Sequence, residues 1–137
     1  MKIVLDTNVW LSAFITRGSC HELIRHCLRH HQLIISEFIF DEIEGHLSDK
    51  FKFPPDKVKK IQKFIKENTE KVAVPPLESP VCRDPEDDAV LSTMSVGEVD
   101  CLITGDNDLL VLKSFQNIPI LTPKGFWEFE KKIKQIY

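Results

Sequence analysis

Short runs of consecutive apolar residues alternate along the chain with longer segments whose apolar residues recur every three or four positions. The short runs predict buried strands, because a strand that is covered on both faces carries apolar side chains on both. The longer segments predict amphipathic helices. Strands that alternate with helices predict an α/β fold with a parallel sheet covered on both faces. The expected strands are residues 3–5, 33–35, 72–74, 101–104 and 118–121.

Polar capping residues and prolines predict where the helices begin. Ser19 and Ser36 are expected to cap the helices that follow them, and Asp56 is expected to open another, with Phe64 facing inward. Asp84 precedes a proline, which is a strong helix start because proline fits the first helical position. The expected helices are residues 9–15, 20–30 and 36–47, a helix from 56, a helix from 84, residues 109–112 and a helix from 123.

The bulk properties indicate one ordinary globular domain over residues 1–137, since the chain is 42% hydrophobic and 28% charged. A net charge of −3 argues against a surface that grips a nucleic-acid duplex by overall basicity. No two cysteines have the C-x-x-C spacing of a zinc knuckle or a thioredoxin site. With no signal peptide and no apolar run near the ~20 residues that cross a bilayer, we expect a cytoplasmic protein without membrane contact.

Two acidic residues directly follow predicted strands. Asp6 comes after the first strand and Asp106 after the strand at 101–104. Ligands of open parallel sheets bind at the carboxyl ends of the strands, so both carboxylates are expected at one edge. An aspartate after a strand is also a common turn former or helix cap, and for either residue alone both interpretations stay open.

Helical geometry adds two further acids. Glu42 borders the apolar stripe of the 36–47 helix, and Glu44 borders its other edge, so the pattern prefers Glu42 only slightly. Asp87 lies on the buried stripe of the helix from 84, whereas Asp88 is offset by roughly 100° around the helix. A carboxylate on a buried stripe is costly unless it is paired or binds a metal, although an acid near a helix N-terminus is also favoured by the helix dipole.

Several carboxylates held together repel one another and need a cation. Oxygen ligands without cysteine or histidine suit hard ions such as Mg²⁺ or Mn²⁺ rather than zinc. Such an ion can bind a phosphodiester, activate a water and stabilise the leaving oxygen. The acids therefore point to a metal-dependent hydrolase of phosphodiesters.

Four segments in this order resemble the PIN-domain family over essentially the whole chain, and in particular the small prokaryotic PIN proteins described as toxins of toxin–antitoxin pairs. No segment decides the matter alone; their order and spacing do. The segments are residues 3–8 (IVLDTN), the 36–47 helix with Glu42, residues 84–88 (DPEDD) and residues 102–109 (LITGDNDL).

The resemblance implies a three-layer α/β/α sandwich around a parallel sheet of about five strands, and a Mg²⁺- or Mn²⁺-dependent endoribonuclease. It implies RNA as substrate and a cognate antitoxin as partner, and we also expect a homo-oligomer, a dimer. It assigns the catalytic acids in order, and it leaves the third open between two neighbours, of which the stripe argument prefers Asp87. The implied residues are Asp6, Glu42, Asp87 and Asp106 as catalytic acids, Asp6, Asp87, Asp106 and Asp108 as metal ligands, and Asn8, Thr104 and Asp88 as supporting residues.

Other features allow further interpretations. Four of the five histidines are His21, His26, His30 and His31, and both a metal site and a solvated surface that faces RNA are open, with the second favoured because His26 and His30 lie opposite the apolar face. A phosphatase or phosphoaspartyl receiver also places acids at parallel strand ends, but no lysine of the kind that a receiver needs follows a strand here. A non-catalytic RNA- or protein-binding module on the same fold is the other alternative.

Overall fold

The computed structural model describes residues 1–75 and 80–136, and its central feature is a six-stranded sheet in the order β3-β2-β1-β4-β6-β5. All strands are parallel except β5, which pairs antiparallel with β6 at the edge. The sheet is mostly parallel and flanked by helices, as the sequence predicts. The strands are β1 (Lys2–Leu5), β2 (Gln32–Ser36), β3 (Glu70–Val72), β4 (Cys101–Ile103), β5 (Ser114–Phe115) and β6 (Ile118–Leu121).

The chain winds outward from β1 to β2 and β3, then crosses back to β4, so the connections cover both faces of the sheet. Right-handed crossovers put the helices of the first half on one face and α5 on the other. In agreement, α5 packs against β1, β2 and β3, while α7 packs against α2. The helices are α1 (Thr7–Ile15), α2 (Ser19–His30), α3 (Glu37–Gly45), α4 (Pro55–Asn68), α5 (Pro85–Gly97), α6 (Asn107–Leu110) and α7 (Pro123–Ile136).

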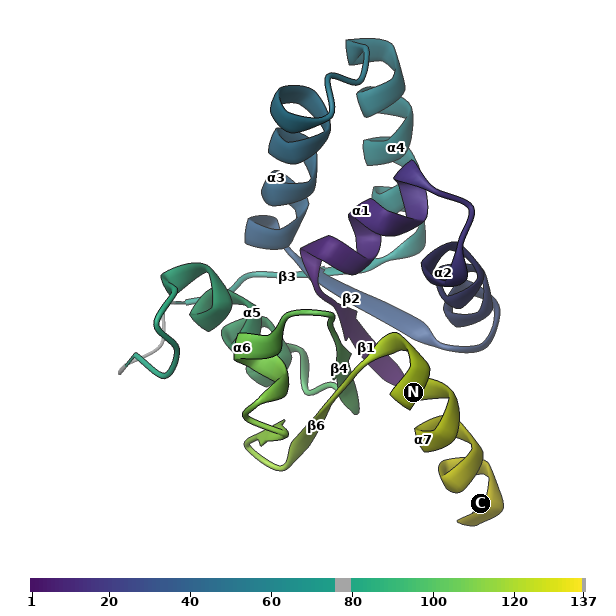
Figure 1. Cartoon of the computed structure of the whole chain (residues 1–137), viewed down its shortest axis with the longest axis vertical. Helices are drawn as coiled ribbons and strands as arrows, with labels where there is room; N and C mark the ends of the chain where they lie inside the picture. The colour runs from purple at the N-terminus through teal and green to yellow at the C-terminus, as the bar shows by residue number, and fades with distance from the viewer. Residues whose placement is uncertain (76–79, 137) are drawn as a thin grey trace.

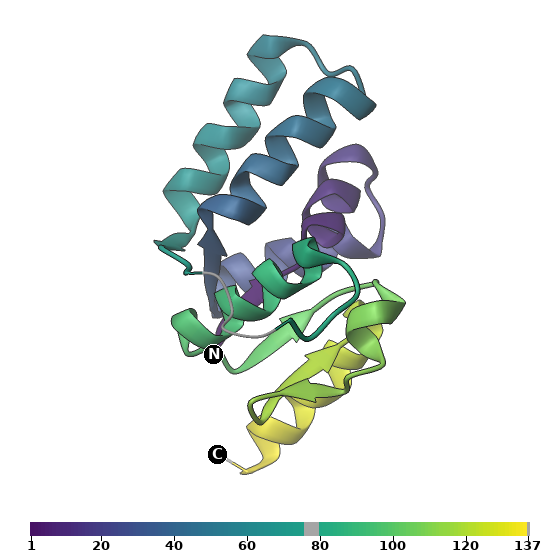
Figure 2. The ribbon, with the colours of Figure 1, turned by 90° about the vertical axis from the view of Figure 1, so that its left-hand side faces the viewer.

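Helices α3 and α4 form a hairpin that runs away from the sheet (Figures 1 and 2). A π-helical turn, His46–Lys50, prolongs α3 before the connection to α4. Lys66 of α4 and Lys71 of β3 each place their Nζ atom 5.2 Å from the centroid of the Phe40 ring on α3. No helix among the described residues is long and apolar enough to span a membrane.

The core lies on both faces of the central strands. Ile3, Val4 and Leu5 of β1 are fully buried, and so are all three residues of β4. This is why these strands appear in the sequence as unbroken apolar runs rather than as alternating patterns. Trp10 on α1 is also fully buried and stacks on Phe14 at 6.1 Å between ring centroids.

Several predicted boundaries are wrong by one or two residues. The third strand is Glu70–Val72 rather than 72–74, and α6 begins at Asn107 because the Asp106 side chain caps it. Helix α2 begins at Ser19 itself, after Gly18 and without a side-chain cap, and α4 begins at Pro55 rather than Asp56. Of these ends, only the start of α6 is set by a side-chain cap, and element ends commonly shift by one or two residues from those that a hydrophobic pattern indicates.

Two further expectations about the hydrophobic pattern fail. Phe64 is 39% exposed, because Val58, Ile61 and Ile65 form the buried stripe of α4 and Phe64 packs edge-on against Phe14 at its flank. Strand β5 was not expected, since it is only two residues long. It pairs with β6 through a turn whose central residues, Gln116 and Asn117, have φ of 50° and 66°, as tight hairpins require.

Candidate active site

Asp6 lies where β1 ends and α1 begins, and it is 5% exposed. Its Oδ1 accepts a hydrogen bond from the Thr7 amide at 2.8 Å, so it caps α1. Its Oδ2 accepts a hydrogen bond from Thr104 Oγ1 at 2.7 Å. Burial raises the pKa of Asp6; the hydrogen bonds from Thr104 and Thr7 oppose this, and the charge of Asp106 adds to it. The two hydrogen bonds therefore fix the orientation of the side chain, while burial makes its ionisation costly.

Thr104 connects the two acids that follow strands. The Thr104 hydroxyl donates to Asp6 and accepts a hydrogen bond from the Asp106 amide at 3.0 Å. Asp106 in turn caps α6, since its Oδ1 accepts a hydrogen bond from the Asp108 amide at 2.9 Å. The prediction that Asp6 and Asp106 meet at one sheet edge agrees with this geometry, and so does the placement of Thr104 between them.

Asp87 joins this pair from α5. Asp84 caps that helix and proline follows at its first position, as the sequence predicts, and this sets which face Asp87 presents. Asp87 is 8% exposed, and Asp87, Asp106 and Asp108 each place a carboxylate oxygen within 4.8 Å of the other two. Burial, followed by the nearby charge of Asp106, raises the pKa of Asp87 to about 7. A cation bound beside Asp87 would favour its ionised form and lower this pKa.

Asp88 points elsewhere. Its Oδ1 accepts hydrogen bonds from the backbone amides of Val81 and Cys82, at 3.1 and 2.9 Å. It therefore shapes the loop that leads into α5 and supports the site only indirectly. Asp87 thus lies with Asp106 and Asp108 while Asp88 contacts the loop, and the choice of Asp87 as the third catalytic acid stays a prediction.

Glu42 reaches the site from α3, where the Ser36 hydroxyl caps the helix by accepting a hydrogen bond from the Ile39 amide. Its Oε1 accepts a hydrogen bond from Thr7 Oγ1 at 2.6 Å. Burial raises the pKa of Glu42 to about 7, with the neighbouring Glu86 and, more weakly, Asp6 adding to the effect. Glu44, the alternative in the sequence pattern, is exposed.

Two residues of the site were not predicted, and one predicted residue lies outside it. Thr7 holds Glu42, and Glu86 of α5 lies beside Glu42. Asn8, expected to support the acids, is exposed, and the described residues give it no hydrogen bond to them. The sequence marks Thr7 only by its position directly after Asp6. Because α1 begins at Thr7, the Thr7 side chain faces α3 and reaches Glu42. Glu86 carries no signal beyond its place beside Asp87.

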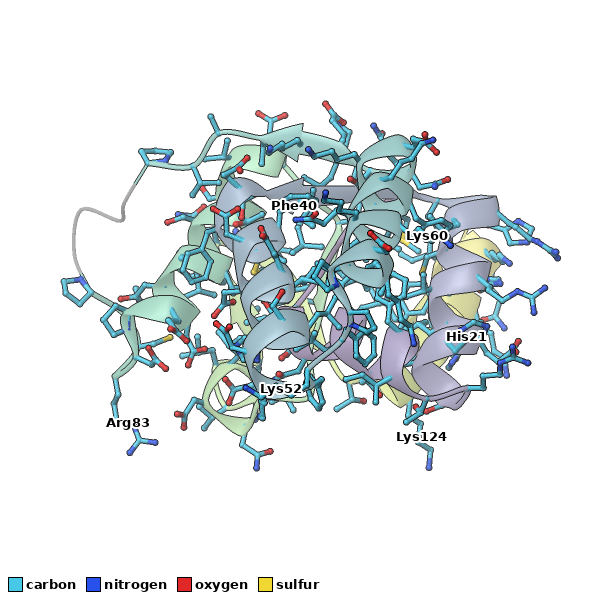
Figure 3. The ribbon with its side chains drawn as sticks, turned by 90° about the horizontal axis from the view of Figure 1, so that it is seen from above. His21, Phe40, Lys52, Lys60, Arg83 and Lys124 are labelled. Atoms are coloured by element: carbon cyan, nitrogen blue, oxygen red, sulfur yellow. The ribbon has the colours of Figure 1, made fainter. Side chains whose placement is uncertain are left out.

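One cation faces this group within the described part of the chain. Arg83, in the loop before α5, places Nη2 2.8 Å from Asp108 Oδ1, while 86% of its side chain stays exposed. Figure 3 shows Arg83 projecting from the edge of the molecule. Because the pair is so open to solvent, it contributes little to neutralising the buried acids.

The donor set fits a hard divalent cation. Asp6, Asp87, Asp106 and Asp108 offer only carboxylate oxygens, which Mg²⁺ and Mn²⁺ prefer. Cys82 lies close by, but burial and the charges of Asp88 and Asp87 raise the pKa of its thiol to about 11, so it stays protonated and is no ligand. Burial, and then repulsion from neighbouring carboxylates, raises the pKa of Asp6 and Asp87, and a bound cation would oppose both effects. The residues present thus fit the ion that the acidic pattern implies.

Comparison with known proteins agrees with this architecture. The family model of the PIN domain matches residues 2–108, which include every acid described above. No curated protein matches the chain. Among solved structures, VapBC2 from Rickettsia felis, in a crystal structure with a DNA fragment from its promoter, is similar with a TM-score of 0.62 and 14% identity, over 88% of this chain and 97% of that one. The match of the family model over most of the length identifies the chain as a member of the PIN-domain family.

Proposed function

We propose that this chain is a Mg²⁺- or Mn²⁺-dependent endoribonuclease that hydrolyses RNA phosphodiester bonds. The observation that carries the proposal is the convergence of Asp6, Asp87 and Asp106, with Asp108 beside them, at the carboxyl edge of the sheet. Membership of the PIN-domain family supports the same activity. A non-catalytic module would have no need for buried carboxyl groups with raised pKa values.

The roles of the residues follow from their contacts. Asp6, Asp87, Asp106 and Asp108 would hold the ion, which when bound would orient the phosphodiester, lower the pKa of an attacking water and stabilise the leaving oxygen. Thr104 keeps Asp6 and Asp106 in register. Glu42, with a pKa of about 7, can take up and release a proton near neutral pH, as a general base requires.

The proposed test is cleavage of a mixed RNA pool by the full chain, followed by analysis of the ends. We expect 5′-phosphate and 3′-hydroxyl ends, complete inhibition by EDTA and rescue by Mn²⁺. Asp6→Asn should abolish turnover. Two matched pairs separate site acids from neighbours: Asp87→Asn against Asp88→Asn, and Glu42→Gln against Glu44→Gln. The second member of each pair should retain most of the activity, since its side chain points away from the cluster.

A histidine mechanism gives the opposite result. It uses the RNA 2′-hydroxyl, needs no metal and leaves a 2′,3′-cyclic phosphate. His31 directly precedes β2, so it lies at the amino edge of the sheet, opposite the acids. Cyclic-phosphate products formed in EDTA would refute the carboxylate mechanism. Absence of any cleavage with Mn²⁺ would favour the binding-module alternative.

We further propose that the protein is the toxin of a toxin–antitoxin pair and acts in the cytoplasm as a dimer. The similarity to VapBC2 and the family membership support this role. A cognate antitoxin would suppress activity most directly by placing a basic side chain among the crowded carboxylates. Expression should slow growth, and co-expression of the adjacent small reading frame should relieve it. Normal growth with enzymatically active protein in several hosts would contradict the toxin role while leaving the nuclease intact.

A further inference from the structure

A second group of metal-ligating side chains lies away from the acids. His26 is on α2, His31 follows the end of α2, and Glu130 is on α7. The Nε2 atoms of His26 and His31 lie 2.6 and 2.5 Å from the same carboxylate oxygen, Oε2 of Glu130. The expectation that these histidines form a solvated surface is therefore wrong for His31, whose side chain is buried, while His26 is only partly exposed.

The burial of this group is unusual for its charge. The side chain of Glu130 is 7% exposed, that of His31 is 8% exposed and that of His26 is 22% exposed. A buried carboxylate needs hydrogen-bonding or charged partners. One such partner would satisfy Oε2 of Glu130, but two imidazoles contact it. Lys134 contacts only the other oxygen, Oε1, at 3.5 Å, so Oε2 belongs to the histidines.

We infer that His26, His31 and Glu130 form a binding site for a zinc-class transition metal ion that fastens α7 to α2. Two imidazole nitrogens and one carboxylate are a ligand set that Zn²⁺ uses, with a fourth position left to water. Mg²⁺, which demands oxygen ligands, would disfavour it. The chain would thus carry two chemically distinct sites, with oxygen ligands at the carboxyl edge of the sheet and nitrogen-rich ligands on α2 and α7.

The geometry allows an ion with little rearrangement. Zn–N and Zn–O bonds of about 2.0–2.1 Å in a tetrahedron place ligand atoms roughly 3.3 Å apart, so the present contacts would widen by about 0.8 Å. The three ligand atoms already lie within 4.8 Å of one another. Solvent can reach His26 through a cavity of about 250 Å³ lined by Glu22, Arg25, His26, Arg29, His30 and Trp127.

The groups around the cluster set the conditions for binding. The amino nitrogen of Met1 lies 3.2 Å from His31 Nδ1, so the second ring nitrogen of this histidine also has a polar neighbour. The Lys134 ammonium, 3.5 Å from Glu130 Oε1, opposes a cation at this cluster. Cys27 is buried with its pKa raised to about 12, so it does not compete as a thiolate.

The test is titration of metal-free full-length protein with Zn²⁺ by calorimetry, in excess Mg²⁺ to occupy the acids. We expect one Zn²⁺ per chain, a higher melting temperature on binding, and a tetrahedral Co²⁺ spectrum without a sulfur charge-transfer band. Changing the hydrogen-bonding neighbour of a ligand already weakens binding by about 10- to 100-fold, so Glu130→Gln and His26→Gln should weaken it at least that much. Glu130→Gln keeps the size of the side chain, and circular dichroism checks that it folds.

His21→Ala is the matched control, since His21 lies on the same helix but contacts the Ala13 carbonyl, at 3.3 Å (Figure 3). It should bind Zn²⁺ as the unchanged chain does. Asp6→Asn with Asp106→Asn should also leave Zn²⁺ binding unchanged, which separates this site from the proposed nuclease site. Equal Zn²⁺ affinity in Glu130→Gln and the unchanged chain, or no binding in excess Mg²⁺, would overturn the inference and leave a hydrogen-bonded cluster that only docks α7.

Discussion

Replacing Thr104 with valine tests whether one hydroxyl holds the two strand-end acids. Valine has nearly the same shape, so the change removes the hydroxyl without opening a cavity. Thr104 is fully buried and makes two hydrogen bonds, as donor to Asp6 Oδ2 and as acceptor from the Asp106 amide. Both partners would lose their bond in a place that water reaches poorly.

The expected cost follows from those two bonds. A hydrogen bond to a charged group contributes about 1.5–3 kcal/mol, and a neutral one about 0.5–1.5 kcal/mol. We therefore expect Thr104→Val to lower the free energy of unfolding by about 3 kcal/mol, a large part of the ~5–15 kcal/mol of a typical domain. Thr104→Ser keeps the hydroxyl and loses one methyl group, which should cost only about 1 kcal/mol.

Urea denaturation in EDTA measures the free energy of unfolding of both variants. Calorimetry measures their Mn²⁺ affinity, and the difference shows how much the fixed orientation of Asp6 contributes to binding. Thr104→Val should bind Mn²⁺ at least about tenfold more weakly than Thr104→Ser, as is usual when a hydrogen-bonding neighbour of a ligand is lost. Equal stability and equal Mn²⁺ affinity of the two variants would refute the reasoning, because it would mean that the hydroxyl orients neither acid.

Three further changes test other parts of the structure. Asp87→Asn should stabilise the metal-free protein most at pH 8, above the folded-state pKa of about 7. The gain should be smaller at pH 5 and absent below the unfolded value of 3.8, where the carboxyl group is protonated in both states. Thermal melts in EDTA across this pH range decide this, and a loss of stability at pH 8 would contradict it. Gly97→Ala should lower the free energy of unfolding by about 1–3 kcal/mol, because the new Cβ would lie 2.9 Å from Ile34 Cγ2. Gly45→Ala is the control: its Cβ would meet nothing within 4 Å, so urea denaturation should show it to be neutral or stabilising. Ser36→Ala should cost about 1–2 kcal/mol by the same measurement, since Ser36 caps α3 and lies 2.9 Å from Thr93 Oγ1.

The sequence predicted the sheet, and the place of Asp6 and Asp106 at its edge, because both depend on local signals. A buried strand appears as an unbroken apolar run, and an acid directly after it must lie at the carboxyl edge. Asp6 and Asp106 follow that rule, and Asp87 follows from a capped helix start. Ordinary turn chemistry explains each acid separately, so only the fold brings them together.

The remaining parts depend on contacts between distant segments. The choice of Glu42 over Glu44 rests on Thr7, which is 35 residues away in the chain. Glu130 meets His26 and His31 across 104 and 99 residues, and nothing near Glu130 in the sequence marks it as their partner. Strand β5 is too short for any periodicity. Such features come from packing, which a pattern along one segment does not encode.

The pairing of β1 with β4 has a consequence for the newly made protein. Asp6 meets Thr104 across 98 residues, so the first acid emerges from the ribosome long before its partners. An unfinished chain carries Asp6 and Glu42 without Asp87 or Asp106, and a truncated product lacks the strand that brings them together. If the chain is the nuclease proposed above, we expect no cleavage of the messenger during its own translation, because Asp106 must be made and β4 docked beside β1 before the acids come together.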